Sequence, residues 1–227
     1  MKYIKIVISL FLISSFSCNE AHDHDSGHNH ANEHMQQYSV EEISKEFDSE
    51  ERKLWQKPDE VIALLGDLEG KTVIDIGAGT GYFSFRLAEK GAHVIAADVD
   101  DRFQDFIRKK MAENDGAGLD VELRKVPYDS PELQAGEAHF AIIVNTYHHI
   151  EDRIEYFKKV LHGLKTAGKL MVVDFQKKEF ENAPHGPPLR MRLEHNQVIK
   201  ELQEAGFSYI ELNESLLDYQ YIIIAEK

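Results

Sequence analysis

The stretch Val73-Ile74-Asp75-Ile76-Gly77-Ala78-Gly79-Thr80-Gly81 joins a run of apolar residues directly to a loop that contains three glycines. An apolar run of this length predicts a buried strand, and the residues after Gly81 have the pattern of a helix. Glycine lets the backbone turn sharply and lets a ligand approach the main chain, beside the unpaired N–H groups at the start of a helix. We therefore predict a strand, a ligand-binding loop and a helix, in that order.

The spacing of the glycines bears on the kind of ligand. The dinucleotide-binding fingerprint G-x-G-x-x-G would place its third glycine at position 82, which is Tyr82. The third glycine is Gly81 instead, so the pattern is G-x-G-x-G. This spacing argues against a bound pyrophosphate and against an NAD-dependent oxidoreductase. A tight structural turn is the other interpretation of the loop.

The chain beyond Gly70 alternates strand-like apolar runs with helical stretches, which is typical of a parallel sheet with crossover helices. The predicted strands are 72–76, 93–97, 121–126, 140–145 and 169–175, and the predicted helices are 81–90, 101–113, 152–164 and 193–205. The third helix is expected to end at Thr166-Ala167-Gly168, and 207–212 with 219–225 predict a terminal hairpin. We predict an α/β domain over residues 67–227, with a doubly wound sheet and helices on both faces.

A carboxylate ends the second predicted strand, in Val94-Ile95-Ala96-Ala97-Asp98. In a doubly wound fold, a carboxylate about 20 residues beyond the glycine loop accepts hydrogen bonds from the ribose hydroxyls of a bound nucleoside. Asp100 and Asp101 lie close by, but they fit a turn and a helix cap better. We therefore predict that Asp98 binds ribose.

The motif DIGAGTG at 75–81, Asp98 and the stretch Leu164-Lys165-Thr166-Ala167-Gly168-Lys169-Leu170 together resemble class I S-adenosylmethionine-dependent methyltransferases. The resemblance covers about residues 55–227. It implies a Rossmann-like, seven-stranded sheet whose last strand is antiparallel, and S-adenosyl-L-methionine as the cofactor. It also implies that Asp75 supports a loop whose cofactor-lining residues are Gly77, Ala78, Gly79 and Gly81.

Asp129 matches the position where this family often places an acid near the adenine amino group. An aspartate that caps a turn before Pro131 is the alternative interpretation.

The stretch Val144-Asn145-Thr146-Tyr147-His148-His149-Ile150 follows the fourth predicted strand, at the sheet edge where an acceptor would meet the cofactor. It resembles the strand-end motif of small-molecule methyltransferases of the ubiquinone and menaquinone biosynthesis type, and we place Asn145 among the cofactor-binding residues. Methyl transfer needs a base only if the acceptor carries a proton to remove. His148 and His149 are the candidates for that base, and Tyr147 is a candidate to pack against the sulfonium. For each histidine, a backbone hydrogen bond or a helix start is the alternative.

The segment 174–192 contains Pro184-His185-Gly186-Pro187-Pro188, with Arg190, Arg192 and His195 close behind. In the resembling enzymes this region helps form the acceptor pocket. Two interpretations stay open: basic residues that bind an acidic acceptor, or a surface connection.

The segment 39–66 is a lead-in to the domain, and we predict that it forms two short helices with a break near Pro58. Trp55 lies in this lead-in and fits either a lid or a core position.

The N-terminal residues have the pattern of an export signal. Lys2 and Lys5 precede an apolar run over 6–16, which is shorter than the roughly 20 residues of a membrane span. Its end at Cys18 resembles a bacterial lipoprotein signal, which implies a lipid on Cys18 and a place at the cell envelope. A plain secretory signal, or an N-terminal anchor with the domain facing the cytoplasm, is the alternative.

Residues 19–38 predict a disordered tether, because the polar composition cannot form a core. The tether alternates acidic residues with five histidines: His22, His24, His28, His30 and His34. These either form a weak divalent-metal site or belong to a solvated linker.

Composition limits the functions that this chain can have. The formal charge of -14 without a basic stripe argues against a nucleic-acid partner, and a single cysteine excludes a disulfide framework and a cysteine-based zinc site. The sequence thus predicts S-adenosylmethionine-dependent methyl transfer to an unidentified small molecule. The alternative is an exported metal-binding lipoprotein on a non-catalytic scaffold.

Overall fold

The computed structural model describes residues 38–113, 118–181, 184 and 186–227. The predicted signal at 1–18 with Cys18, nearly all of the tether with its five histidines, and His185 lie outside the described residues. Within these ranges, no helix has both the length and the apolar character that crossing a bilayer requires.

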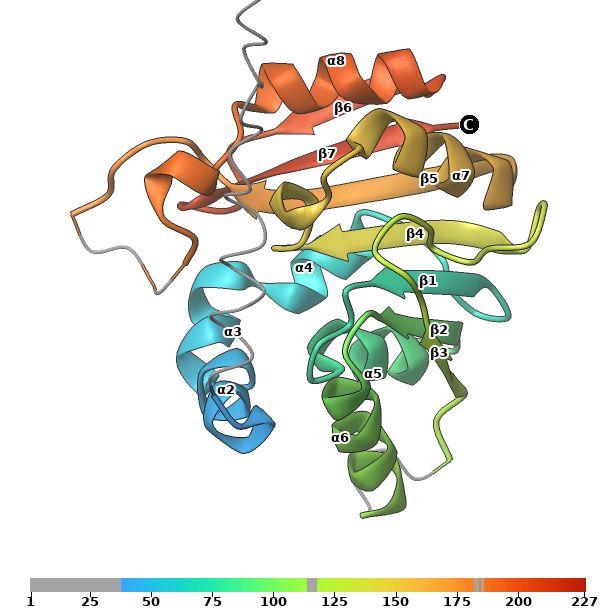
Figure 1. Cartoon of the computed structure of the whole chain (residues 1–227), viewed down its shortest axis with the longest axis vertical. Helices are drawn as coiled ribbons and strands as arrows, with labels where there is room; N and C mark the ends of the chain where they lie inside the picture. Colours follow the sequence, from blue (N-terminus) through green and yellow to red (C-terminus); the bar gives the residue numbers. More distant parts are fainter. Residues whose placement is uncertain (1–37, 114–117, 182–183, 185) are drawn as a thin grey trace, which may run out of the picture.

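Seven strands form one sheet in the order β3-β2-β1-β4-β5-β7-β6 (Figure 1). Their bounds are β1 Thr72–Ile76, β2 His93–Asp98, β3 Val121–Lys125, β4 Ala138–Val144, β5 Leu164–Phe175, β6 Ser208–Asn213 and β7 Gln220–Glu226. The pairs among β1 to β5 are parallel, whereas β7 is antiparallel to both β5 and β6. This confirms the predicted seven-stranded, Rossmann-like sheet with an antiparallel last strand.

Helices cover both faces of the sheet, as predicted (Figure 1). Their bounds are α4 Pro58–Ala63, α5 Tyr82–Glu89, α6 Asp101–Ala112, α7 Arg153–Gly163 and α8 His195–Ala205. Successive strand residues point to opposite faces. In β4, Ile142 packs with α4, α5 and α6, and the next residue, Ile143, packs with α7 and α8. The two faces therefore bury two separate apolar layers.

The lead-in forms three helices rather than the predicted two: α2 Val40–Phe47, α3 Glu50–Gln56 and α4. The prediction was wrong because polar side chains restart the helix. Ser39 caps α2 with a capping box, and the Ser49 hydroxyl accepts the N–H of Arg52 at 3.2 Å to start α3. Lys57, at φ 44°, then turns the chain into α4.

The β5 strand begins at Leu164, five residues before the predicted start at Lys169. The expected helix stop at Thr166-Ala167-Gly168 lies inside this strand, because Leu164 is fully buried and already pairs with Ala138 before a bulge shifts the register.

The carboxyl ends of β1 and β4 lie very close together. Gly77 has φ 74°, and a Cβ atom placed on it would lie 2.5 Å from the side chain of Thr146. Only glycine tolerates both the left-handed backbone and this contact.

Replacing Gly77 by alanine is expected to lower the free energy of unfolding by about 2–4 kcal/mol, from the positive φ and the overlap with Thr146. Gly66 is the matched control, because it has φ 85° and nothing within 4 Å of its added Cβ. Gly66→Ala should cost about 1–2 kcal/mol. Urea unfolding of both variants measures the difference, and equal losses would contradict the role of the Thr146 contact.

Candidate active site

The glycine loop is tied to the end of β2 by its own backbone. The N–H groups of Gly77 and Ala78 donate to the carbonyl of Ala97 at 2.9 and 3.1 Å. The N–H of Gly79 donates to the Asp98 carboxylate at 2.8 Å. With Gly79 at φ 54° and Gly81 at φ 79°, the loop turns tightly into the start of α5.

Asp98 lies buried beside this loop, with 5% of its surface exposed. One oxygen accepts from Gly79 and the other accepts the N–H of Asp100 at 2.9 Å. Burial raises the pKa of Asp98 to about 6, and these backbone hydrogen bonds oppose the rise. Each carboxylate oxygen has a second lone pair, so further donors such as hydroxyls can still be accepted. Asp100 caps α6 through the N–H of Arg102.

Asp75 ties β1 to α5 beneath the loop. Its carboxylate accepts the hydroxyl of the fully buried Ser84 at 2.6 Å. Burial raises the pKa of Asp75 to about 6, and the hydrogen bond from Ser84 opposes this. Asp75 therefore joins the strand before the loop to the helix after it.

At the end of β4, the side chain of Asn145 belongs to a buried chain of amides. Its Oδ1 accepts from Gln220 at the start of β7, and Gln220 accepts from Gln56 of α3 at 2.9 Å. Gln56 and Gln220 are fully buried. Sequence reasoning missed both, because single glutamines at the ends of elements form no motif.

His148 pairs with Asp174 of β5. Its Nδ1 lies 2.8 Å from one carboxylate oxygen of Asp174 and 3.0 Å from the other, and its backbone N–H donates to the same group at 3.3 Å. His148 is 2% exposed and Asp174 is fully buried. Sequence reasoning missed Asp174, whose only signal is its position at the carboxyl end of a strand.

His148 lies in the 3-10 helix η1 Tyr147–His149, together with the other two candidates, Tyr147 and His149. Neither of these two pairs with Asp174. His149 is half-buried with its ring 4.3 Å from the His148 ring. Tyr147 is fully buried, stacks on Phe157 at 4.8 Å and donates its hydroxyl to Glu201 at 2.9 Å. The prediction that Tyr147 packs against the sulfonium is therefore wrong, because the turn directs its ring into the core beneath α7 and α8.

The segment after β5 is held by Arg192. Its guanidinium donates to the carbonyls of Pro187 at 2.8 Å and Lys178 at 3.0 Å, and it lies 5.2 Å from the Phe175 ring. It is 7% exposed, so it organises the loop instead of facing an acidic acceptor. His195 pairs with Glu214 at 3.3 Å.

Trp55 of α3 packs on Phe175 at 5.9 Å and on Tyr219 at 6.5 Å, so the lead-in contacts the ends of β5 and β7.

Asp129 is largely exposed, and its nearest ionic partner is Lys159 at 3.4 Å. Its predicted place near adenine stays a prediction.

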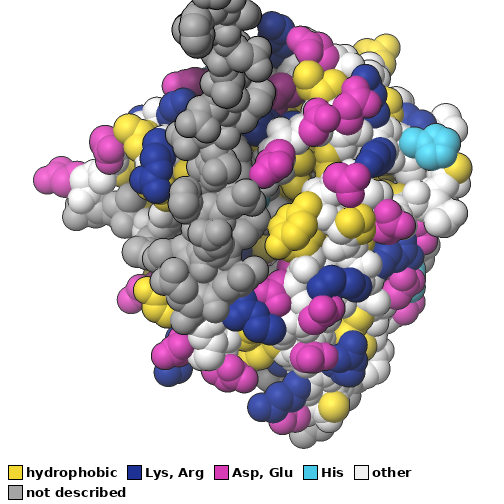
Figure 2. All heavy atoms as spheres, viewed as in Figure 1, with side chains coloured by type: hydrophobic (Ala, Val, Ile, Leu, Met, Phe, Trp, Pro, Cys, Tyr) yellow, Lys and Arg dark blue, Asp and Glu magenta, His cyan; other side chains and the backbone are white. Residues whose placement is uncertain are grey.

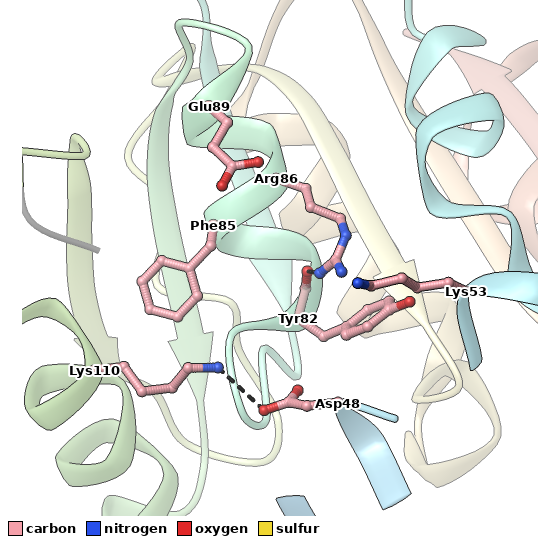
Figure 3. Close-up of a pocket in the computed structure, with 7 residues that line it drawn as sticks. All are labelled: Asp48, Lys53, Tyr82, Phe85, Arg86, Glu89 and Lys110. Carbon is pink, nitrogen blue, oxygen red and sulfur yellow. Dashed lines mark hydrogen bonds and ion pairs between the residues drawn. The ribbon is translucent and has the colours of Figure 1, made fainter. Parts of the chain in front are cut away.

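The junction of α2 and α3 lies directly on the glycine loop. Phe47 is 3.8 Å from the Cβ position of Gly79, and Thr80 donates its hydroxyl to Asp48 at 2.7 Å. Lys110 of α6 holds the other Asp48 oxygen at 3.1 Å, as the dashed line in Figure 3 shows. The α2–α3 junction thus covers one side of the glycine loop.

A cavity of about 380 Å³ lies beside this junction, between α5, α6 and α3 (Figure 3). It is lined by Asp48, Lys53, Tyr82, Phe85, Arg86, Glu89 and Lys110. The lining includes no residue from the ends of β1, β2 or β4. This cavity is therefore separate from the strand ends that carry the candidate site.

Two further observations concern ligands. Among the residues that the structure describes, no group of three or more His, Cys, Asp or Glu is arranged to hold a metal ion. On the face in Figure 2, Lys and Arg are interspersed with Asp and Glu, and they form no basic stripe.

Comparisons with known proteins agree with this geometry. A family model described as a methyltransferase domain matches residues 73–168. An uncharacterized methyltransferase from Staphylococcus carnosus is 30% identical over 159 residues, which cover 65% of this chain and 68% of that protein. A demethylmenaquinone methyltransferase from Clavibacter sepedonicus is 25% identical over 148 residues, which cover 65% of this chain and 58% of that protein.

Solved structures show the same fold. The crystal structure of a SAM-dependent methyltransferase from Aquifex aeolicus has a TM-score of 0.73 at 24% identity, covering 83% of this chain and 98% of that one. The chain spans about half the length of the first curated relatives that it matches, 46% and 58% for two of them. By its matched domain, its relatives and its fold, the chain belongs to the S-adenosylmethionine-dependent methyltransferase family.

Proposed function

We propose that this chain transfers the methyl group of S-adenosylmethionine to a small-molecule acceptor that carries an ionisable proton, with His148 as the base. The observation that carries the proposal is the buried His148–Asp174 pair at the end of β4, the strand next to the glycine loop. The name of the Clavibacter relative, a demethylmenaquinone methyltransferase, also supports a small acceptor.

The residues at the sheet edge fit the cofactor. The buried carboxylate of Asp98 can accept hydrogen bonds from ribose hydroxyls, and Gly79 and Gly81 bring the backbone of the loop to the start of α5. Asn145 lies across the loop at the end of β4, opposite Asp98. When bound, the cofactor supplies an electrophilic methyl group on a positively charged sulfur.

The pairing with Asp174 sets the proton positions on His148. In the proposed arrangement, Nδ1 of His148 donates to the Asp174 carboxylate and Nε2 keeps a lone pair. The cofactor, held by Asp98 and the glycine loop, would supply an electrophilic methyl group to a lone pair of the acceptor atom, and its sulfur would keep the electrons of the broken sulfur–methyl bond. Nε2 of His148 takes the acceptor proton. Asp174 stabilises the resulting imidazolium.

The lead-in excludes water from this step. Phe47 and the Asp48–Thr80 hydrogen bond close the glycine loop from one side, and Trp55 packs on the β5 end. Water exclusion strengthens electrostatic interactions at a site and prevents hydrolysis of its reactants.

His148→Gln is expected to lower methyl transfer by at least about 100-fold, because it removes the base, while affinity for S-adenosylhomocysteine stays unchanged. The measurement is tritium transfer from labelled cofactor to a panel of phenols, amines and thiols, with calorimetry for binding. His149→Gln is the matched control and should retain activity within about threefold. A large loss for His149→Gln alone would assign the base to His149 instead.

Asp98 should make cofactor binding pH-dependent. Burial raises its pKa to about 6, so the carboxyl is ionised near neutral pH and becomes protonated as the pH falls below 6. The protonated group is the weaker acceptor for ribose hydroxyls, so affinity for S-adenosylhomocysteine should fall about tenfold between roughly pH 7.5 and pH 5. Calorimetry across this range measures the change.

Two variants distinguish the protonation of Asp98 from that of Asp75, the other buried carboxyl with a pKa of about 6. Asp98→Asn should bind S-adenosylhomocysteine weakly, with an affinity that does not change with pH. Asp75→Asn should keep the pH-dependent affinity of the wild type. Unchanged pH dependence in Asp98→Asn would rule out the ribose contact.

We further propose that a lipid on Cys18 holds the chain at the cell envelope. The support is the basic, apolar and cysteine order of residues 2–18. Mass spectrometry of the native protein should show an N-terminus at Cys18 with added lipid, and Cys18→Ala should move the protein out of the membrane fraction. An intact Met1 would contradict the proposal. Protease treatment of intact cells distinguishes the alternative, an anchor with the domain in the cytoplasm.

A further inference from the structure

Glu201 of α8 accepts hydrogen bonds from three side chains next to the turn η1. Its Oε2 atom accepts the Tyr147 hydroxyl at 2.9 Å and Nε of Arg153 at 2.7 Å. Its Oε1 atom accepts Nη2 of Arg153 at 3.0 Å and the Gln197 side chain at 2.9 Å. A carboxylate has about four lone-pair sites, so these four donors use the whole hydrogen-bonding capacity of Glu201.

The protonation of this group is set by burial and by its hydrogen bonds. The side chains of Glu201 and Arg153 are each 14% exposed. Burial opposes the charge on Glu201, but its hydrogen bonds, first of all that from Arg153, outweigh burial and lower the pKa of the carboxyl. Burial also raises the pKa of Tyr147 well above its usual value, so its hydroxyl keeps its proton. Tyr147 therefore donates a charge-assisted hydrogen bond to an ionised carboxylate.

These contacts hold both ends of the turn that carries His148. Tyr147 is the first residue of η1, and Ile150 follows the last residue of η1. Arg153 donates through Nη1 to the carbonyl of Ile150 at 3.0 Å, while its other two donor nitrogens reach Glu201. Glu201 is thus connected directly to the residue before His148 and, through Arg153, to the second residue after it.

The packing of α7 on α8 does not require these charges. Phe157 and Val160 of α7 are fully buried in one apolar cluster with Val198 and Leu202 of α8. A buried ion pair adds little net stability, because the cost of removing two charges from water offsets their attraction, but it can fix one conformation. Arg153 also occupies the first position of α7, where the helix dipole disfavours a cation. The network therefore specifies the conformation of the turn more than it stabilises the pair of helices.

We infer that Glu201 is a positioning residue for the proposed base, because it fixes η1 so that the His148 ring meets the Asp174 carboxylate. The inference rests on the proposed function, which takes His148 as the base. Asp174 holds one side of the ring, with its carboxylate 2.8 Å from Nδ1. The direction of Nε2 then depends on where η1 places the backbone of His148, and Glu201 sets that place. A displacement of about 1 Å at a reacting group can lower a rate by about 100-fold.

Glu201→Gln is expected to lower kcat for methyl transfer by roughly 10- to 100-fold, because the amide presents N–H groups where the carboxylate accepts them. The KM for S-adenosylmethionine and the affinity for S-adenosylhomocysteine should stay within about threefold of the wild-type values, since the change affects the base and not cofactor binding. Kinetics use the phenol, amine or thiol that the wild-type chain methylates fastest, and calorimetry measures binding.

A spectroscopic signal tests the His148–Asp174 pair without turnover. In proton NMR of the full chain, the proton on Nδ1 of His148 should give a signal that is protected from exchange with solvent. Its assignment follows from its loss in His148→Gln. Glu201→Gln should broaden or abolish this signal, because the turn no longer holds the ring against the carboxylate. A role of Glu201 in helix packing alone would leave the signal unchanged.

Glu137→Gln is the matched control. Glu137 also accepts two nitrogens of one arginine, Arg124, at 3.0 and 2.8 Å. It precedes β4, so it lies at the opposite end of that strand from η1. Glu137→Gln should keep kcat within about threefold of the wild-type value and leave the His148 signal unchanged.

Tyr147→Phe removes only the hydroxyl that reaches Glu201, and it decides the matter if Glu201→Gln does not fold. It should lower kcat by at least about threefold and broaden the His148 signal, with binding of S-adenosylhomocysteine unchanged. An unchanged signal or an unchanged kcat in a folded variant would overturn the inference, as would an equal loss in Glu137→Gln. A wild-type chain that methylates no member of the panel would contradict the proposed function, and the NMR signal would still decide whether Glu201 positions His148.

Discussion

The hydrogen bond from the Gly79 N–H to the buried Asp98 carboxylate is the contact on which the candidate site depends. It joins the loop after β1 to the end of β2 at 2.8 Å. A buried carboxylate is costly unless donors surround it, and here the backbone of the loop and of Asp100 supplies them. The loop must then keep the left-handed conformations that its glycines adopt, and this places the start of α5 beside Asp98.

The lead-in helices complete the site through polar contacts in addition to apolar ones such as the stacking of Phe47 on Phe103. Asp48 accepts from Thr80, and Gln56 reaches Gln220 and so Asn145. Thr80, Gln56 and Gln220 are buried and need their partners, because an unsatisfied polar group in the interior costs about 1–3 kcal/mol. Such a network specifies one arrangement of α2 and α3 over the loop. The same segment contributes Arg52, a buried cation whose guanidinium lies 4.1 Å from the centre of the Tyr82 ring.

The His148–Asp174 pair shows how the sheet assembles chemistry from separate strands. The two residues are 26 positions apart, and β4 and β5 pair in parallel, so their carboxyl ends meet at one edge. Tyr147, one residue earlier, instead stacks on Phe157 of α7 and donates its hydroxyl to Glu201 of α8. A single turn thus divides neighbouring residues between the site and the core.

The sequence by itself determined the strand–loop–helix order, the Rossmann-like sheet and the placing of Gly77 to Gly81 beside Asp98. The strand and helix order, the loop and Asp98 follow from local patterns, namely apolar periodicity, glycine spacing and a carboxylate at a strand end, whereas the resemblance to a known family implied the Rossmann-like, seven-stranded sheet. Only the tertiary structure decided the partners of His148, the core position of Tyr147, the role of Arg192 in its own loop and the burial of Arg52. Each of these depends on contacts between residues far apart in the chain, and no local pattern specifies which side chains will meet once the sheet and its helices have packed.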